Sequence, residues 1–121
     1  MWPTRLSHKQ EQGRQWENMA QAYLERHGLV IIEANFRCKL GEIDLIMRDG
    51  ATLVFVEVRQ RAAGAQVSAA ASIGPAKIRR ILRASQFYLQ GLHRTPPCRI
   101  DVVAIDGEHV EWIRNAIEDM A

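Results

Sequence analysis

The segment GEIDLIMRDGATLVFVEVRQR, residues 41–61, sets the architecture of this chain. Two apolar segments rich in β-forming residues, 42–47 and 52–59, lie on either side of Asp49-Gly50. An Asp-Gly pair between two such segments favours a tight turn, because glycine adopts the positive φ that these turns require. The pattern therefore predicts a β-hairpin that turns at residues 49–50.

Two carboxylates converge in this hairpin. Side chains alternate between the faces of a strand, so a two-residue loop places Asp44 opposite Phe55 and diagonal to Glu57, with Cβ atoms within about 8 Å. A loop two residues longer places Asp44 directly opposite Glu57, at about 5 Å. Carboxylates at that distance repel by roughly 3 kcal/mol at an effective dielectric of about 20, so a cation between them is favourable. An oxygen-only ligand set indicates Mg²⁺ or Mn²⁺.

The same pattern has a second interpretation, in which both acids face solvent on an exposed sheet face. Arg59 follows Glu57 by two residues and projects from the same face. It is then either an ordinary salt-bridge partner or a group that holds a phosphate and stabilises a phosphoryl-transfer transition state. Val, Phe, Ile and Leu flank each acid, which argues against full exposure.

Residues 13–27 have the apolar spacing of a helix, and Gly28 is placed to end it. The apolar stripe consists of Trp16, Met19, Ala20, Tyr23 and Leu24. Residues 1–12 are expected to form a mobile polar arm. Glu17 lies on the edge of the stripe, where it either projects toward the two acids or is a surface carboxylate near the positive end of the helix dipole.

The remaining segments predict one α/β domain over residues 1–121. The expected elements are a short strand at 29–32, a polar connection at 35–41, a flexible loop at 62–74, a helix from Pro75 to Gly91, strands at 99–105 and 109–113, and a weakly helical tail at 115–121. The order is α-β-β-loop-α-β-β, and an extra strand inside the loop is left open. Arg99 and Asp101 share one face of a strand, which predicts a structural ion pair.

Composition narrows the class of protein. The chain has 121 residues, 47% hydrophobic and 25% charged, which is typical of one soluble globular domain and argues against disorder. Its two cysteines form no CxxC pattern, which argues against a zinc site and for a reducing compartment. The sequence shows no signal peptide and no apolar run long enough to span a membrane. These features predict a cytoplasmic protein without a membrane partner.

Basic residues concentrate in one part of the chain, although the net charge is only +2. The cluster comprises Lys77, Arg79, Arg80 and Arg83, preceded by Arg59 and Arg61. Such a cluster attracts nucleic-acid phosphates through counterion release. The alternative is a solvated helix face.

Several segments together resemble the YraN family. They are WENMAQAYLERHG at 16–28, GEIDLI at 41–46, FVEVRQR at 55–61, the segment from Lys77 to Leu89, and RIDVVAI at 99–105. This bacterial family is related to the archaeal Holliday junction resolvases and to the PD-(D/E)XK nucleases. The resemblance implies a restriction-endonuclease-like α-β-β-β-α-β core, with a mixed central sheet flanked by helices.

The resemblance also implies a site and an activity. The metal-binding residues of the family fall on Glu17, Asp44 and Glu57, which would hold Mg²⁺ or Mn²⁺ for hydrolysis of phosphodiesters in DNA, branched DNA included. Arg59, Arg61, Lys77 and Arg80 are the candidates for nucleic-acid contact. Resolvases of this fold act as dimers, which leaves a homodimer open for this chain.

One position departs from the nuclease pattern. Arg59 stands where active nucleases of this fold carry a lysine that positions or activates the attacking water. Arginine keeps the charge and can bind phosphate, but it cannot lose a proton near neutral pH. Two alternatives to a Mg²⁺-dependent endonuclease therefore stay open: a non-catalytic nucleic-acid-binding module that retains the fold, and an interaction protein with neither property.

Overall fold

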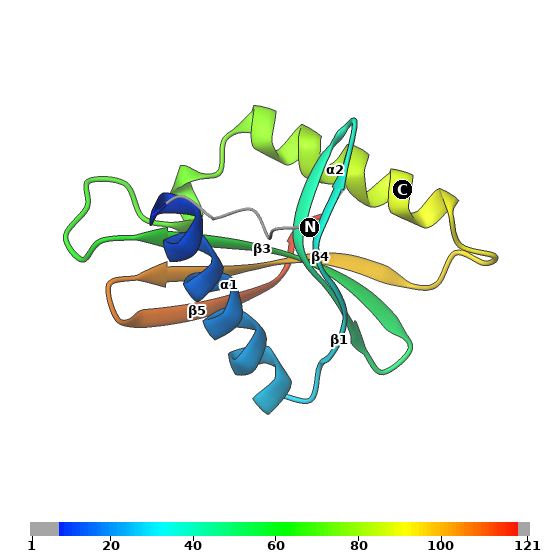
Figure 1. Ribbon diagram of the computed structural model, residues 1–121, viewed down its shortest axis with the longest axis horizontal. Coiled ribbons are helices and arrows are strands. Elements are labelled where there is room, and N and C mark those ends of the chain that lie inside the picture. Colours follow the sequence, from blue (N-terminus) through cyan, green and yellow to red (C-terminus); the bar gives the residue numbers. More distant parts are fainter. Residues whose placement is uncertain (1–7, 119–121) are drawn as a thin grey trace, which may run out of the picture.

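The computed structural model describes residues 8–118, which form two helices and a five-stranded sheet (Figure 1). The elements in chain order are α1 (His8–Arg26), β1 (Val30–Cys38), β2 (Gly41–Asp49), β3 (Thr52–Arg61), the short 3-10 helix η1 (Ala70–Ser72), α2 (Pro75–Gln90), β4 (Cys98–Asp106) and β5 (His109–Ile117). No helix within residues 8–118 is long and apolar enough to cross a membrane.

The sheet has the strand order β1-β2-β3-β4-β5 and is mixed. Strands β3 and β4 are parallel, with α2 in the connection between them, and the other neighbouring strands are antiparallel. The predicted mixed sheet is therefore confirmed, as is the α-β-β-β-α-β element order, to which β5 is added at one edge.

The two helices cover opposite faces of this sheet (Figure 1). Along β3, Val54 and Val56 belong to the cluster beneath α1, whereas Leu53 and Phe55 belong to the cluster beneath α2. All four side chains are buried, so β3 runs through the centre of the molecule. Any charged side chain on this strand is consequently removed from water unless it lies near a strand end.

The β2–β3 turn differs from the prediction by one residue. Asp49 pairs with Thr52, so the turn residues are Gly50 and Ala51 rather than Asp49 and Gly50. Gly50 has φ +59°, as hairpin turns with glycine first require. The shift produces the register that was expected only for a longer loop, in which residue 44 lies level with residue 57.

Strand β1 is longer than the predicted strand at 29–32, and the predicted polar connection at 35–41 is reduced to a turn at residues 39–40. Phe36 packs against the core beneath α2 and pairs with Ile43 of β2, so the strand continues. Asn35 has φ +57°, a conformation that asparagine tolerates within an otherwise extended segment.

Three other boundaries also differ. Helix α1 begins at His8, so the predicted arm is wrong for residues 8–12, and residues 1–7 lie outside the described part. The loop at 62–74 contains η1 and no strand. Strand β5 continues to Ile117, which packs into the core, so the predicted helical tail is wrong for residues 115–117. Residues 119–121 lie outside the described part.

Candidate active site

Asp44 lies where β2 and β3 cease to pair through their backbones. The paired residues extend from the turn as far as Leu45 and Val56. Two residues further along β3, the backbone N–H of Val58 donates a hydrogen bond to Asp44 Oδ2 at 2.8 Å. The Asp44 side chain thus takes the place of a strand partner, which fixes its carboxylate beside β3.

Glu57 meets Asp44 at this point and is almost completely buried, with 2% of its surface exposed. The two carboxyl groups lie close enough for each to shift the pKa of the other. Glu57 Oε2 also forms an ion pair with Lys77 Nζ at 3.3 Å. No group in the described part of the chain forms a hydrogen bond with the buried Oε1 atom of Glu57. The two acids predicted to converge are therefore in direct contact.

The pKa of each acid reflects this crowding. Burial raises the pKa of Glu57, and the negative charge of Asp44 raises it further, to about 9, although Lys77 opposes the rise. Burial also raises the pKa of Asp44, against the hydrogen bonds from Glu57 and from the Val58 backbone. At neutral pH the pair consequently retains a proton.

Glu17 approaches the pair from α1. Burial, followed by the charges of Asp44 and Glu42, raises the pKa of Glu17 to about 7, while a hydrogen bond with Asn35 lowers it. Within residues 8–118, the buried Oε1 atom of Glu17 has no hydrogen-bond partner. The charge of Asp44 thus acts on both of the other predicted acids, but no three His, Cys, Asp or Glu side chains within the described residues form a group that could hold a metal ion.

Lys77 is a member of this site that the sequence pattern assigned only to nucleic-acid contact. It is the third residue of α2, whose start is set by Gly74 at the N-cap and Pro75 in the first turn. Its ammonium group contacts Glu57 as described and lies 4.0 Å from Glu42 Oε1. A lysine just inside a proline-initiated helix was visible in the sequence, but its direction depends on how α2 packs on the sheet.

The other predicted basic residues lie on two sides of the acids. Arg59 donates hydrogen bonds to Ser72, at 3.2 Å from Nε to Oγ and 3.3 Å from Nη2 to the carbonyl oxygen. Within residues 8–118 it forms no ion pair with an acid. Arg61 donates to the carbonyl of Gln60 at 3.1 Å. Arg80 instead lines a pocket beside Lys77.

Comparison with known proteins identifies the family to which this chain is similar. Residues 16–105 match the model of the uncharacterised protein family UPF0102. That range contains all the predicted acids, Arg59 and the whole of α2.

Curated relatives bear the same family name. A UPF0102 protein from Janthinobacterium sp. (strain Marseille) is 53% identical over 110 residues, which cover 91% of this chain and 89% of the relative. One from Cupriavidus metallidurans is 57% identical over 108 residues, covering 88% and 81%. One from Methylococcus capsulatus is 48% identical over 116 residues, covering 93% and 94%. These names give a family and no activity.

Proposed function

The chain belongs to the uncharacterised protein family UPF0102, the YraN family, and we propose that it is a metal-dependent nuclease that hydrolyses phosphodiester bonds in DNA. The observation that carries the proposal is the contact of Asp44, Glu57 and Lys77 at the buried end of the β2–β3 pairing. The order α1-β1-β2-β3-α2-β4 in a mixed sheet supports a restriction-endonuclease-like core for this site.

The residues at the site suit Mg²⁺ or Mn²⁺. Both metals prefer oxygen ligands, and Mg²⁺ is commonly held by one or two carboxylates together with substrate phosphates and water. Asp44 and Glu57 supply two carboxylates, and Glu57 Oε1 has no hydrogen-bond partner within residues 8–118. A divalent ion there would replace the proton that the pair retains at neutral pH, and Glu17 would complete the ligand set after a side-chain movement.

When bound, the metal would polarise the scissile phosphate and favour ionisation of a water molecule. Lys77 is placed to hold a phosphate oxygen next to Glu57, because its ammonium group already lies 3.3 Å from that carboxylate. Lysine presents its charge as a compact ammonium group with three donors, unlike the planar guanidinium of arginine. We infer that Lys77, from α2, serves as the lysine that position 59 lacks.

Glu17 is suited to proton transfer in this arrangement. A general acid or base works best when its pKa lies near the working pH, and the pKa of Glu17 is about 7. Its Oε1 atom, which has no hydrogen-bond partner among the described residues, is the acceptor we assign for a proton from the attacking water. Glu17 would thus act either as this acceptor or as a metal ligand.

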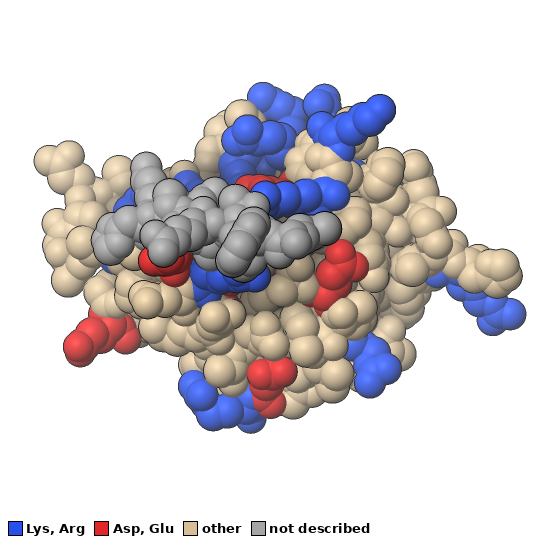
Figure 2. Space-filling model, viewed as in Figure 1, with Lys and Arg blue, Asp and Glu red and all other residues tan. Residues whose placement is uncertain are grey.

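A basic surface beside the acids supports a nucleic-acid substrate. Arg79, Arg80 and Arg83 of α2 are exposed. Figure 2 shows Lys and Arg side chains gathered along the upper edge of the molecule, where Figure 1 places α2 and the β1–β2 turn. This surface can hold the DNA backbone while the acids act on one phosphate.

A cleavage assay tests the proposal. We expect the purified protein to cut at least one of labelled single-stranded, duplex, flapped or four-way DNA in Mg²⁺ or Mn²⁺, and Asp44→Asn and Lys77→Met to lose this activity. The matched control is Glu25→Gln, because Glu25 is an exposed acid at the far end of α1. Circular dichroism checks that each variant folds.

The same assay distinguishes the alternatives. If the protein binds DNA with salt-sensitive affinity and cuts none of these substrates with either metal, the non-catalytic module is the better description. If it neither binds nor cuts, both nucleic-acid functions are wrong. Calorimetric titration with Mn²⁺ adds an independent readout, since Asp44→Asn should abolish metal binding whether or not the correct DNA substrate was supplied.

A further inference from the structure

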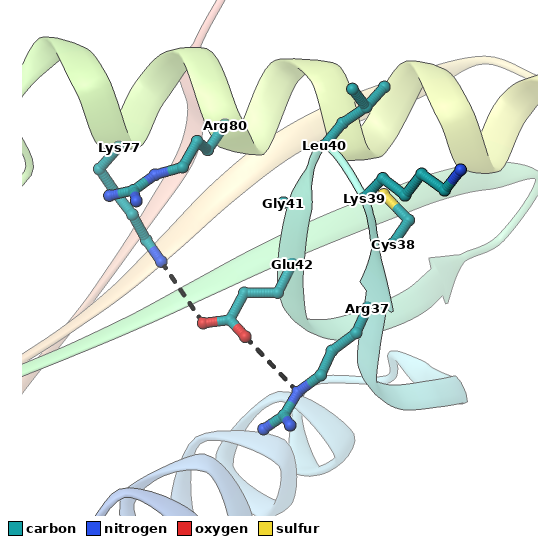
Figure 3. Close-up of a pocket in the computed structure, with 8 residues that line it drawn as sticks. All are labelled: Arg37, Cys38, Lys39, Leu40, Gly41, Glu42, Lys77 and Arg80. Carbon is teal, nitrogen blue, oxygen red and sulfur yellow. Dashed lines mark ion pairs between the residues drawn. The ribbon is translucent and has the colours of Figure 1, made fainter.

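A second feature lies next to the acids, between the β1–β2 turn and α2. It is a cavity of about 360 Å³ (Figure 3). Four of its lining residues are basic: Arg37, Lys39, Lys77 and Arg80. Among the described residues that line it, Glu42 is the only acid. The cavity therefore combines a strong positive charge with a single carboxylate, which identifies it as a candidate anion site.

Glu42 occupies the position that an anion would take. Its Oε2 atom lies 3.5 Å from Arg37 Nε of β1, and its Oε1 atom lies 4.0 Å from Lys77 Nζ of α2 (Figure 3). The Glu42 side chain is 51% exposed, and exposed ion pairs are weak. A phosphate, with more charge and more acceptor oxygens, can therefore displace this carboxylate at little cost.

The walls of the cavity are held in place by close backbone packing. A Cβ atom at Gly41 would lie only 2.6 Å from the carbonyl oxygen of Arg80. The β1–β2 turn consequently rests directly on α2, which only glycine at position 41 allows. The basic residues of the turn and of the helix are thereby brought to one cavity by the fold itself.

The cavity is continuous with the acid pair through Lys77. The same ammonium group lies 3.3 Å from Glu57 and 4.0 Å from Glu42. A phosphate that displaced Glu42 would remove one of the two carboxylates competing for Lys77. Occupation of the cavity would therefore change the charge around the acids.

We propose that this cavity binds a backbone phosphate of the nucleic-acid substrate next to the one that is cleaved, and that the Glu42 carboxylate holds its place until substrate binds. Arg80 and Arg37 supply guanidinium groups, which match a phosphate in two-point geometry. The inference rests on the proposed nuclease function, because the phosphate bound in the cavity belongs to the same DNA chain as the phosphate that is cleaved.

Binding measurements without cleavage test this site. The affinity of a fluorescently labelled four-way DNA and of a duplex is measured by anisotropy in EDTA over a range of salt concentrations. We expect Arg80→Ala to weaken binding about tenfold and to reduce the salt slope by about one, as loss of one phosphate contact does. Arg94→Ala, which removes an exposed arginine just beyond α2, is the matched control.

Glu42→Gln has the opposite expected effect. Removing the competing carboxylate should tighten DNA binding about threefold, whereas Glu25→Gln changes the net charge equally and should leave the affinity unchanged. Inorganic phosphate is titrated separately, with nitrogen-15 NMR of the arginine side chains as the readout. We expect it to bind weakly at Arg80 and to compete with DNA.

Each outcome bears on a different claim. If the wild-type protein binds and cleaves DNA, but Arg80→Ala matches Arg94→Ala and Glu42→Gln matches Glu25→Gln, the cavity is not a phosphate site and the nuclease function stands. If inorganic phosphate binds there without competing with DNA, the cavity takes small anions and the inference is wrong. If the wild-type protein neither binds nor cleaves DNA, the inference and the proposed function fail together.

Discussion

Two buried acid clusters of this molecule differ in how their oxygen atoms are satisfied. Asp101 on β4 is fully buried. Its carboxylate accepts hydrogen bonds from Arg99 Nε at 3.0 and 3.2 Å, from Trp112 Nε1 at 2.9 Å and from the Asn115 backbone N–H at 2.9 Å. The predicted Arg99–Asp101 ion pair is thus confirmed, and the charge is fully compensated within the fold.

The pair formed by Asp44 and Glu57 lacks such compensation. Each acid faces another carboxyl group, Lys77 is shared with Glu42, and Glu57 Oε1 has no hydrogen-bond partner in the part of the chain that the structure describes. Burial alone therefore does not distinguish a functional acid from a structural one. Buried acids with complete partners stabilise the fold, whereas incompletely paired acids with raised pKa values indicate a site that an external group completes.

Both clusters occur where a strand pairing is irregular. The β4–β5 register shifts between Ile100 and Val102, and Asn115, in the bulged part of β5, has φ +52° and directs its N–H to Asp101. Asp44 accepts the N–H of Val58 in a comparable way. In both places an aspartate accepts a backbone N–H at the irregular strand pairing. The two places differ in the groups that surround the other carboxylate oxygen atoms.

The largest effect we expect is on Asp101. Asp101→Ala should lower the free energy of unfolding by about 3–5 kcal/mol in urea denaturation, because it leaves Arg99 and the Asn115 N–H without their buried partner. Asp49→Ala is the control, since Asp49 is the half-exposed second partner of Arg99 and should cost about 1 kcal/mol or less. Equal losses for the two variants would contradict a structural role specific to Asp101.

Glu57→Gln should act in the opposite direction. At pH 8 we expect the free energy of unfolding to rise by about 1–3 kcal/mol while cleavage is lost, because an amide of the same shape removes the cost of keeping a buried acid protonated. Parallel urea denaturation and cleavage assays measure the two effects, with Glu25→Gln as the unchanged control. A destabilised Glu57→Gln protein would place Glu57 with Asp101 as a structural acid.

The stability of the wild-type protein should fall as pH rises from 5 to 9 in metal-free buffer. Glu17 and Glu57 have pKa values of about 7 and about 9 in the folded chain, above the ordinary glutamate value of 4.5. The folded state therefore binds more protons than the unfolded state, and each such proton lowers stability by up to about 1.4 kcal/mol per pH unit. Thermal melts in EDTA measure the slope, which Glu57→Gln should reduce.

Magnesium should reverse part of this trend. Metal ions bind ionised carboxylates and displace their protons, so stabilisation by Mg²⁺ should be larger at pH 8.5 than at pH 6. Paired melts with and without Mg²⁺ at the two pH values measure the difference. Equal stabilisation at both would indicate that the ion binds elsewhere.

The sequence was sufficient to predict the hairpin and the meeting of its acids. The many β-forming residues around Asp49-Gly50 indicate two antiparallel strands. The predicted turn is displaced by one residue from the observed turn, but Asp44 and Glu57 are neighbours in either register. Local composition did not predict the length of β1, because tertiary packing determines where that strand ends. Phe36 extends β1 through a polar segment because it packs under α2.

The basic residue that contacts the acids is harder to predict from the sequence than the acids themselves. Strand alternation predicts Arg59 beside Glu57. In the structure its guanidinium group donates instead to Ser72 of η1, in a loop whose sequence has no apolar periodicity. Lys77 reaches the same acid from α2, and no local pattern encodes the angle at which a helix crosses a sheet. The observed site therefore differs from the predicted one because of contacts between elements that are far apart in the sequence.

Arg59→Lys should have the smallest effect of all. Lysine at this position would lose the two hydrogen bonds to Ser72, which we expect to lower stability by about 1 kcal/mol or less and to change cleavage by no more than about twofold. The reason is that Lys77 already supplies a lysine ammonium group at Glu57, so a second lysine on β3 adds little. Cleavage rates for this variant and for Lys77→Met measure the two contributions. A protein that cut DNA only after Arg59→Lys would mean that Lys77 does not replace the missing lysine, and the natural chain would then belong with the non-catalytic binding modules.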